Sequence, residues 1–185
     1  KENKRAMNPD KVEAVAKELA VKVKDSLIEK NKLLVLGGDC TVELGLVAGC
    51  LVLSKNIGLI YIDLDTDLNT PQSVQDGALD WMGVAHLLGL EGTVESLASI
   101  GKKKPMLRPE QVYFFANGYV VEFERKIISE YKIKEMPLEQ VAADPSGTAR
   151  KIVDTWATQF DYLLIHMDLD VLDFNDFQIA ENYRR

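Results

Sequence analysis

Two kinds of apolar pattern alternate along the chain. In residues 8–30, apolar side chains recur every three or four positions, which is typical of an amphipathic helix, and Pro9 occupies a first-turn position after Asn8. Four further segments have helical spacing, at residues 42–53, 78–90, 119–131 and 146–159. Short, continuously apolar runs predict buried strands at residues 32–36, 57–62, 111–116 and 162–167.

The order of these elements predicts the fold class. Strands that alternate with helices form parallel βαβ units. We therefore expect an α/β protein with a mainly parallel sheet, in a single domain of residues 1–185, a length that suits one core rather than two. Because the chain opens with Lys1 rather than Met and stops soon after the last strand, we expect the fold to be incomplete at both ends.

Composition and charge narrow the range of partners. The formal net charge is -7, so we expect neither nucleic acid nor an anionic membrane surface as a partner, whereas a cationic small molecule or a divalent metal suits this balance. No apolar run approaches the roughly 20 residues of a membrane span, and the polar start lacks the apolar segment of a signal peptide. The two cysteines, Cys40 and Cys50, form no disulfide framework, and we expect a cytoplasmic protein.

Acidic residues follow three of the apolar runs. They are Asp39 after the first run, then Asp63, Asp65 and Asp67, then Asp168, Asp170 and Asp173. Parallel sheets bind ligands outside the carboxyl ends of their strands, and residues two apart on an extended strand point to the same side. Converging carboxylates repel one another unless a cation such as Mn²⁺, Mg²⁺ or Ca²⁺ binds between them. For a single strand end, a helix cap or a turn is the favoured explanation of the Asp, but three strand ends together favour a metal site.

These segments resemble motifs of the arginase/agmatinase (ureohydrolase) family. Residues 37–40 (GGDC) resemble G-G-D-H, with Cys40 at the position of a metal-binding His, and residues 63–71 (DLDTDLNTP) resemble D-A-H-x-D-x-N-T-P, with Asp65 at that of another. Residues 166–173 (HMDLDVLD) resemble S-x-D-x-D-x-x-D, and residues 77–88 are similar to the family's H-G-M-P-x-x-x-L-L helix. The resemblance covers residues 33–173 in family order and at family spacing.

The resemblance implies a three-layer α/β/α fold and a dinuclear manganese site. Its two ions would share a hydroxide that attacks the carbon of a small cationic guanidine or amidine, and the protein would form a homo-oligomer. Carried over position by position, the metal ligands are Cys40, Asp63, Asp65, Asp67, Asp168 and Asp170. Asn69 falls where arginases contact the amino-acid end of the substrate, and Glu181 falls on the family's substrate loop.

The departures from the family concern the chemistry itself. Both ligand-histidine positions are changed, and the position that often carries a proton-shuttling His is Asp80, which makes Asp65 and Asp80 the candidate catalytic residues. Four aspartates and two neutral histidines balance two divalent ions, whereas five aspartates and a thiolate exceed them by two negative charges. A protonated Cys40, a single metal ion or a cationic substrate would each relieve the excess. Cys40 also favours zinc or iron over manganese, although a small buried side chain under a tight turn is an equal alternative.

The two histidines have different expected roles. His86 lies among apolar neighbours and is expected to be a packed, hydrogen-bonded residue of the core. His166 lies on the last strand beside Asp168, where a hydrogen bond that orients a metal-binding Asp is one alternative.

Three functions remain in competition. The first is a metal-dependent hydrolase of a linear C–N bond in a guanidine or amidine. The second is a non-catalytic relative with a degenerate metal site, favoured by the two lost histidines. The third is a phosphatase of the haloacid-dehalogenase type, because residues 62–66 (IDLDT) resemble its strand followed by D-x-D, with Asp63 as nucleophile and Asp65 as acid/base. That pattern leaves the motif at residues 37–40 unexplained.

Overall fold

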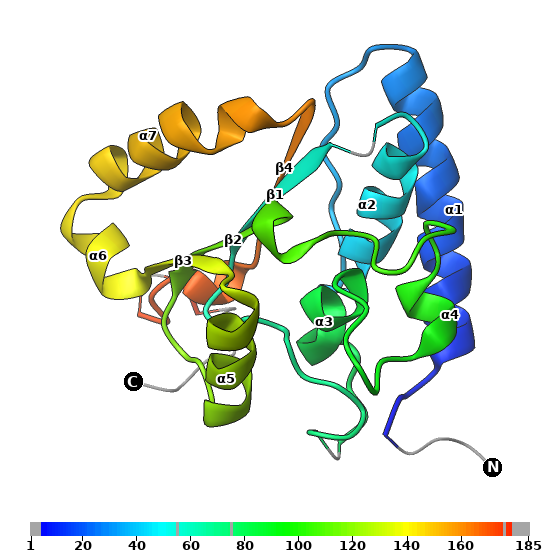
Figure 1. Ribbon diagram of the computed structural model, residues 1–185, viewed down its shortest axis with the longest axis horizontal. Helices are drawn as coiled ribbons and strands as arrows, with labels where there is room; N and C mark the ends of the chain where they lie inside the picture. Colours follow the sequence, from blue (N-terminus) through cyan, green and yellow to red (C-terminus); the bar gives the residue numbers. More distant parts are fainter. Residues whose placement is uncertain (1–4, 55, 75, 176, 179–185) are drawn as a thin grey trace. The chain divides into compact units, whose positions relative to one another are not determined.

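The computed structural model describes residues 5–54, 56–74, 76–175 and 177–178, and it divides into two compact units (Figure 1). The helical unit comprises Lys1–Ile57 and Asp67–Pro109, and the sheet unit comprises Gly58–Thr66 and Glu110–Arg185.

The sheet unit is built on four hydrogen-bonded strands in the order β3-β2-β1-β4. The strands are β1 (Ile57–Ile62), β2 (Val112–Asn117), β3 (Lys134–Pro137) and β4 (Tyr162–Met167). β2 runs parallel to both β1 and β3, with Ile60 opposite Tyr113 and Phe114 opposite Glu135. The expected α/β class with a parallel sheet is therefore confirmed.

One face of this sheet carries an apolar core. The helices of the unit are α5 (Glu122–Tyr131), α6 (Leu138–Ala143) and α7 (Pro145–Thr155), with 3-10 turns at Pro109–Gln111, Ala157–Gln159 and Leu169–Val171. Ile152 of α7 and Trp156 cluster with Ile60 of β1 and Met136 of β3. The indole Nε1–H of Trp156 donates to the carbonyl of Glu110 at 3.3 Å, which satisfies its polar atom inside the cluster.

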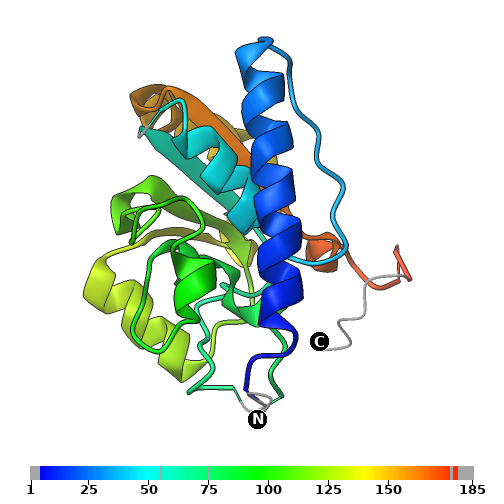
Figure 2. The same ribbon diagram turned by 90° about the vertical axis from the view of Figure 1, so that its right-hand side faces the viewer.

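In the helical unit, two helices pack closely through glycines. The helices are α1 (Pro9–Ile28), α2 (Val42–Leu51), α3 (Gly83–Leu87) and α4 (Glu95–Ala98), with a 3-10 turn at Asp80–Met82. A Cβ on Gly45 would lie 2.6 Å from the carbonyl oxygen of Ala16, and one on Gly49 would lie 2.7 Å from that of Ala20. Because neither glycine has a side chain, α2 can lie directly on the backbone of α1, beside which it runs in Figure 2.

Two predicted elements differ from the structure. The strand expected at residues 32–36 is wrong: among the described residues this run lies outside the sheet, and Leu34 and Leu36 are 84% and 88% exposed. An apolar run becomes a strand only where a neighbouring strand accepts its hydrogen bonds, and sequence alone does not reveal this neighbour. The helix expected at residues 78–90 is divided into the 3-10 turn and α3, which ends before Gly89 with φ +61°.

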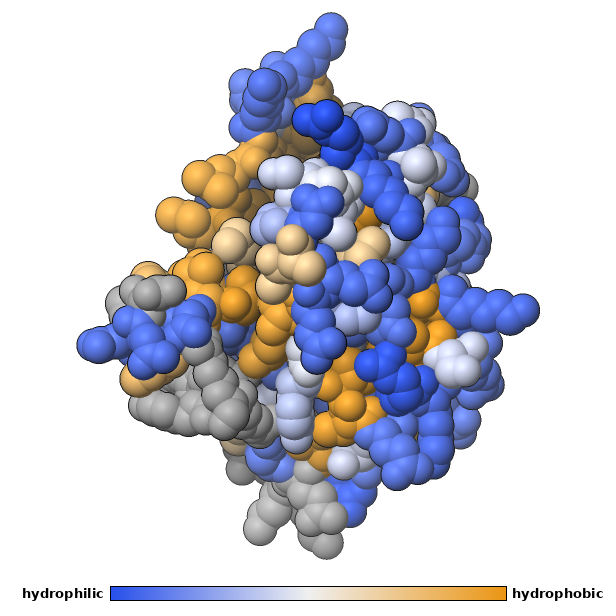
Figure 3. All heavy atoms as spheres, turned by 90° about the vertical axis from the view of Figure 1, so that its left-hand side faces the viewer, coloured by the Kyte–Doolittle hydropathy of each residue, from blue (hydrophilic) through white to orange (hydrophobic). Residues whose placement is uncertain are grey.

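The surface agrees with the charged composition. On the face shown in Figure 3, hydrophilic residues predominate and apolar residues show between them. Within the described residues, no helix combines the length and the apolar character that a membrane crossing requires.

Candidate functional site

The carboxyl ends of β1 and β4 form the same local structure. After β1, the backbone N–H of Asp65 donates to Asp63 Oδ1 at 2.9 Å. After β4, the backbone N–H of Asp170 donates to Asp168 Oδ1, also at 2.9 Å. In both Asp-x-Asp segments the first carboxylate therefore turns the chain by accepting a hydrogen bond two residues on. The hydrogen bond fixes Oδ1 of Asp63 and of Asp168, and thereby sets the direction in which Oδ2 of each carboxylate points.

Hydrogen bonds between the two strand ends bring their carboxylates together. The backbone N–H of Asp168 donates to the carbonyl of Ile62 at 2.8 Å, and the N–H of Leu64 donates to Asp170 Oδ1 at 3.2 Å. Because β1 and β4 are neighbours in the sheet, both Asp-x-Asp segments lie at one edge of it.

Two overlapping groups of possible metal ligands result. Ligand atoms of Asp63, Asp65 and Asp170 all lie within 4.8 Å of one another, as do those of Asp63, His166 and Asp168. Asp63 belongs to both groups and is only 2% exposed, so its charge is shielded little by solvent. Carboxylates at this spacing repel one another, and a divalent cation offsets the repulsion. Carboxylate oxygens with one imidazole nitrogen suit Mn²⁺ and related ions, so the donor set of the sheet unit fits the divalent metal that the resemblance implies.

His166 lies in this site, although the sequence did not place it among the metal ligands. Its ring stacks on that of Tyr61, with centroids 4.1 Å apart and planes 5° from parallel. Its Nε2 lies 3.8 Å from Asp63 Oδ2. The signal that predicts this position is the two-residue period of a strand, which places His166 on the same side of β4 as Asp168.

The helical unit holds four further candidates, Cys40, Asp67, Asn69 and Asp80. Cys40 is buried just before α2, beside Asp39, whose Oδ1 accepts from the N–H and Oγ of Thr41 at 2.8 and 2.5 Å. Asp39 therefore turns the chain into the helix.

Asp67 and Asn69 follow in an irregular segment. Asp67 is 4% exposed and has φ 49°, a left-handed conformation that Asp tolerates better than most residues, and its carbonyl accepts from Ala85 N–H at 3.0 Å. The side-chain carbonyl of Asn69 accepts from Ser73 Oγ at 3.0 Å. The remaining candidate, Glu181, lies outside the described residues.

Asp80 begins the 3-10 turn and is half-buried. Burial raises the pKa of its carboxyl, and the nearby charges of Asp39 and Asp76 raise it further, against hydrogen bonds from the backbone that lower it. A carboxyl whose pKa is displaced upwards accepts and releases protons closer to neutral pH, as a group that transfers protons requires.

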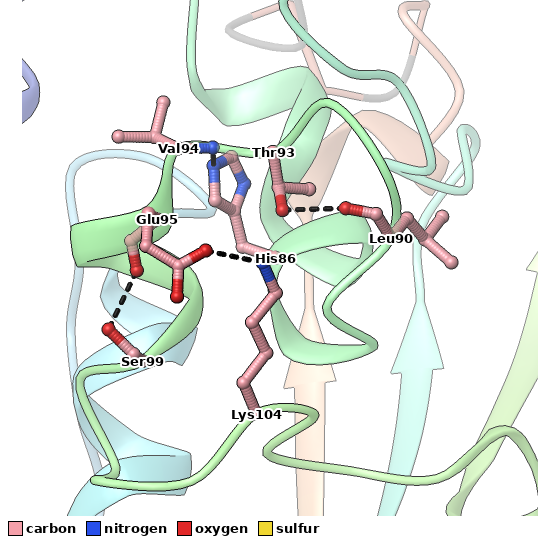
Figure 4. A network of polar contacts seen from close by, with 7 residues as sticks. All are labelled: His86, Leu90, Thr93, Val94, Glu95, Ser99 and Lys104. Carbon is pink, nitrogen blue, oxygen red and sulfur yellow. Dashed lines mark hydrogen bonds and ion pairs between the residues drawn. The ribbon is translucent and has the colours of Figure 1, made fainter.

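His86 is a structural residue, as expected. Its Nε2 accepts from the backbone N–H of Val94 at 3.1 Å (Figure 4), so Nδ1 carries the proton and donates to the carbonyl of Met82 at 2.6 Å. Burial lowers the pKa of His86 below its usual value. Figure 4 also shows Lys104 paired with Glu95 at 2.6 Å beside this network. Cys50 is fully buried, and burial raises the pKa of its thiol to about 12, which agrees with a core residue.

Comparisons with known proteins identify the family of the chain. The model of the Arginase family matches residues 3–177. An arginase of Bacillus subtilis is 33% identical over 178 residues, which are 95% of this chain and 59% of that protein. Human arginase-1 is 28% identical over 171 residues, which are 89% of this chain and 51% of that protein. The crystal structure of an arginase from Bacillus cereus matches with a TM-score of 0.86 at 29% identity, over 95% of this chain and 60% of that one. The chain thus spans between half and three fifths of the length of these relatives.

Proposed function

The chain belongs to the arginase family, and we propose that it is a metal-dependent hydrolase that cleaves a linear C–N bond of a guanidine or amidine compound. The observation that carries this proposal is the acidic group at the ends of β1 and β4, where Asp63 shares its surroundings with Asp65, Asp168 and Asp170. A site of this charge attracts both divalent metal ions and the cationic substrates that a guanidine or amidine offers.

The residues have assigned roles in the proposed reaction. Asp63, Asp65, Asp168 and Asp170 hold metal, and the resemblance to the family motifs adds Cys40 and Asp67 to the ligand set. When bound, manganese or a related ion supplies the Lewis acidity that lowers the pKa of the attacking water. Asp80 carries a proton to the leaving amine, because its raised pKa suits that transfer. Asn69 contacts the substrate away from the reacting carbon, and Glu181 is a further candidate for substrate binding.

A second candidate function is binding without turnover. It is favoured by one specific observation, the replacement of two ligand histidines of the family motifs by Cys40 and Asp65. The phosphatase hypothesis is no longer needed, because the family model covers the Asp-x-Asp segment of residues 63–65 and also the segment at residues 37–40. In addition, Thr66 follows Asp65 directly, one position before the Thr of D-x-D-x-T.

The test is urea or ammonia release from a panel of guanidines and amidines, with the chain loaded with Mn²⁺, Zn²⁺ or Fe²⁺. We expect release from at least one compound, and its loss in an Asp63→Asn, Asp168→Asn variant. A Glu130→Gln, Glu139→Gln variant removes the same charge from exposed positions of α5 and α6 and should keep the activity. Metal binding without release from any compound would favour the non-catalytic function.

A further inference from the structure

We propose that His166 is itself a metal ligand, and that its Nε2 holds a divalent cation together with Asp63 and Asp168. The family motif has Ser at this position, so the assignment comes from the geometry of this chain. It rests on the metal site proposed above, but it does not depend on turnover.

The position of the imidazole is fixed by the sheet. His166 and Asp168 are two residues apart at the end of β4, and Tyr61 and Asp63 are two residues apart at the end of β1, so all four side chains lie on one side of neighbouring strands. The ring of His166 lies flat on that of Tyr61, 4.1 Å away, and the side chain of His166 is 9% exposed. A ring held in this way loses little conformational entropy when it binds an ion.

The distances suit a shared ion better than a direct hydrogen bond. Nε2 of His166 and Oδ2 of Asp63 are 3.8 Å apart, which exceeds the length of a hydrogen bond between a nitrogen and a carboxylate. Two ligand atoms at about 2.1 Å from a common metal, and separated by a tetrahedral angle, lie about 3.4 Å apart. A shift of a few tenths of an ångström would therefore bring both atoms into coordination, and the turn of the chain at Asp63 already uses Oδ1.

Charge and donor type give the site its expected preference. Asp63 and Asp168 carry two negative charges and a neutral imidazole carries none, so the three residues balance one divalent ion. This set supplies a neutral nitrogen donor where the positions of the family's histidines hold Cys40 and Asp65. A nitrogen donor favours Zn²⁺, Co²⁺ or Mn²⁺ over Mg²⁺ and Ca²⁺, which prefer oxygen alone.

The chain contains two histidines, which makes a direct test possible. We would add Zn²⁺ to the metal-free, ¹⁵N-labelled chain and follow the ring nitrogens by NMR, with His166→Ser to assign the signals. The Nε2 resonance of His166 should move to the position of a coordinated nitrogen, while the signals of His86 stay in place because both of its nitrogens are hydrogen-bonded in the helical unit. Zinc that binds without moving the His166 signal, or an absence of zinc binding at millimolar concentration, would overturn the proposal.

Calorimetric titration with Zn²⁺ separates a ligand from a residue that only orients one. Loss of an orienting residue costs about 10–100-fold in metal affinity, so a ligand at His166 predicts a loss above about 100-fold in His166→Ser. A smaller loss would assign His166 an orienting role and reject the proposal. Circular dichroism of the metal-free variant controls for folding, and if His166→Ser does not fold, the NMR result on the unmodified chain decides. Zinc bound at His166 without urea or ammonia release would retain this proposal and reject the hydrolase.

Discussion

Metal ions should stabilise the folded chain through the carboxylates at the ends of β1 and β4. We expect the melting temperature at pH 7.5 to rise with the concentration of Mn²⁺ or Zn²⁺. The response should be absent in an Asp63→Asn, Asp168→Asn variant, because one substitution removes the carboxylate that both ligand groups share and the other removes the ligand on β4.

The size of the effect follows from the spacing of the charges. Two full charges 4.8 Å apart, the limit within which the oxygens of Asp63, Asp65 and Asp170 lie, repel by about 3.5 kcal/mol at an effective dielectric constant of about 20. A bound cation removes repulsion of this order. The measurable gain is set by mass action, at about 2.7 kcal/mol when the free metal is 100 times its Kd. For a chain of this length, that gain corresponds to a rise of about 5–11 °C.

Differential scanning fluorimetry of the chelator-treated chain measures this rise directly. The matched control is Glu130→Gln, Glu139→Gln, which changes the net charge by the same amount at exposed positions of the sheet unit and should respond as the unmodified chain does. An equal rise in the Asp63→Asn, Asp168→Asn variant would show that the metal binds elsewhere. If neither metal at millimolar concentration changes the melting temperature of the unmodified chain, the metal site itself is refuted.

Three further predictions concern single residues. Because burial lowers the pKa of His86, this histidine binds a proton in the unfolded chain before it does so in the folded chain as pH falls below about 6.5. The free energy of unfolding, measured with urea, should therefore decrease by up to about 1.4 kcal/mol per pH unit in that range. His86→Gln should reduce this slope. Gly49→Ala should lower the free energy of unfolding by about 1–3 kcal/mol, because the new Cβ would lie 2.7 Å from the carbonyl oxygen of Ala20. The control is Gly38→Ala, whose Cβ would meet no atom within 4 Å and which should cost less than about 0.5 kcal/mol. Asp65→His should keep or raise the metal content measured by mass spectrometry, since it restores a neutral donor, and a sharp fall would show that the carboxylate is required.

The sequence predicted the sheet best at β1 and β4. β1 and β4 were predicted with their observed bounds, because both runs are followed by acidic residues that end the strand. β3 was missed, since its sequence KEMP combines two charges and a proline and lies at the edge of the sheet, where strand propensity is weak. At residues 32–36 a strand was predicted that the structure does not contain. Both errors arise because the pairing of strands depends on the whole fold and not on the sequence of one segment.

In the site, the two-residue period of a strand was the useful signal. It predicted that Asp63 and Asp65 converge, and the structure brings their oxygens within 4.8 Å. The approach of Asp170 to the end of β1 depends on a hydrogen bond to Leu64, 106 residues away in the chain, and only the strand order reveals it. The period equally applied to His166 and Asp168, but the functional weight of His166 depends on Tyr61 of the neighbouring strand, which no local pattern identifies.

The replacement of the two histidines of the family motifs removes two neutral nitrogen donors to the metal, and His166 supplies one from another position. In the ligand set of the family motifs, histidines at positions 40 and 65 would let four aspartates balance two divalent ions, whereas a thiolate at Cys40 and a carboxylate at Asp65 would exceed that balance. An imidazole at position 166 supplies a neutral donor from β4 and forms, with Asp63 and Asp168, a set that balances one ion. The other carboxylates of the group in the sheet unit, those of Asp65 and Asp170, then either hold a second ion or attract a cationic substrate. The stoichiometry of zinc binding separates these two arrangements, because the first requires two equivalents and the second requires one.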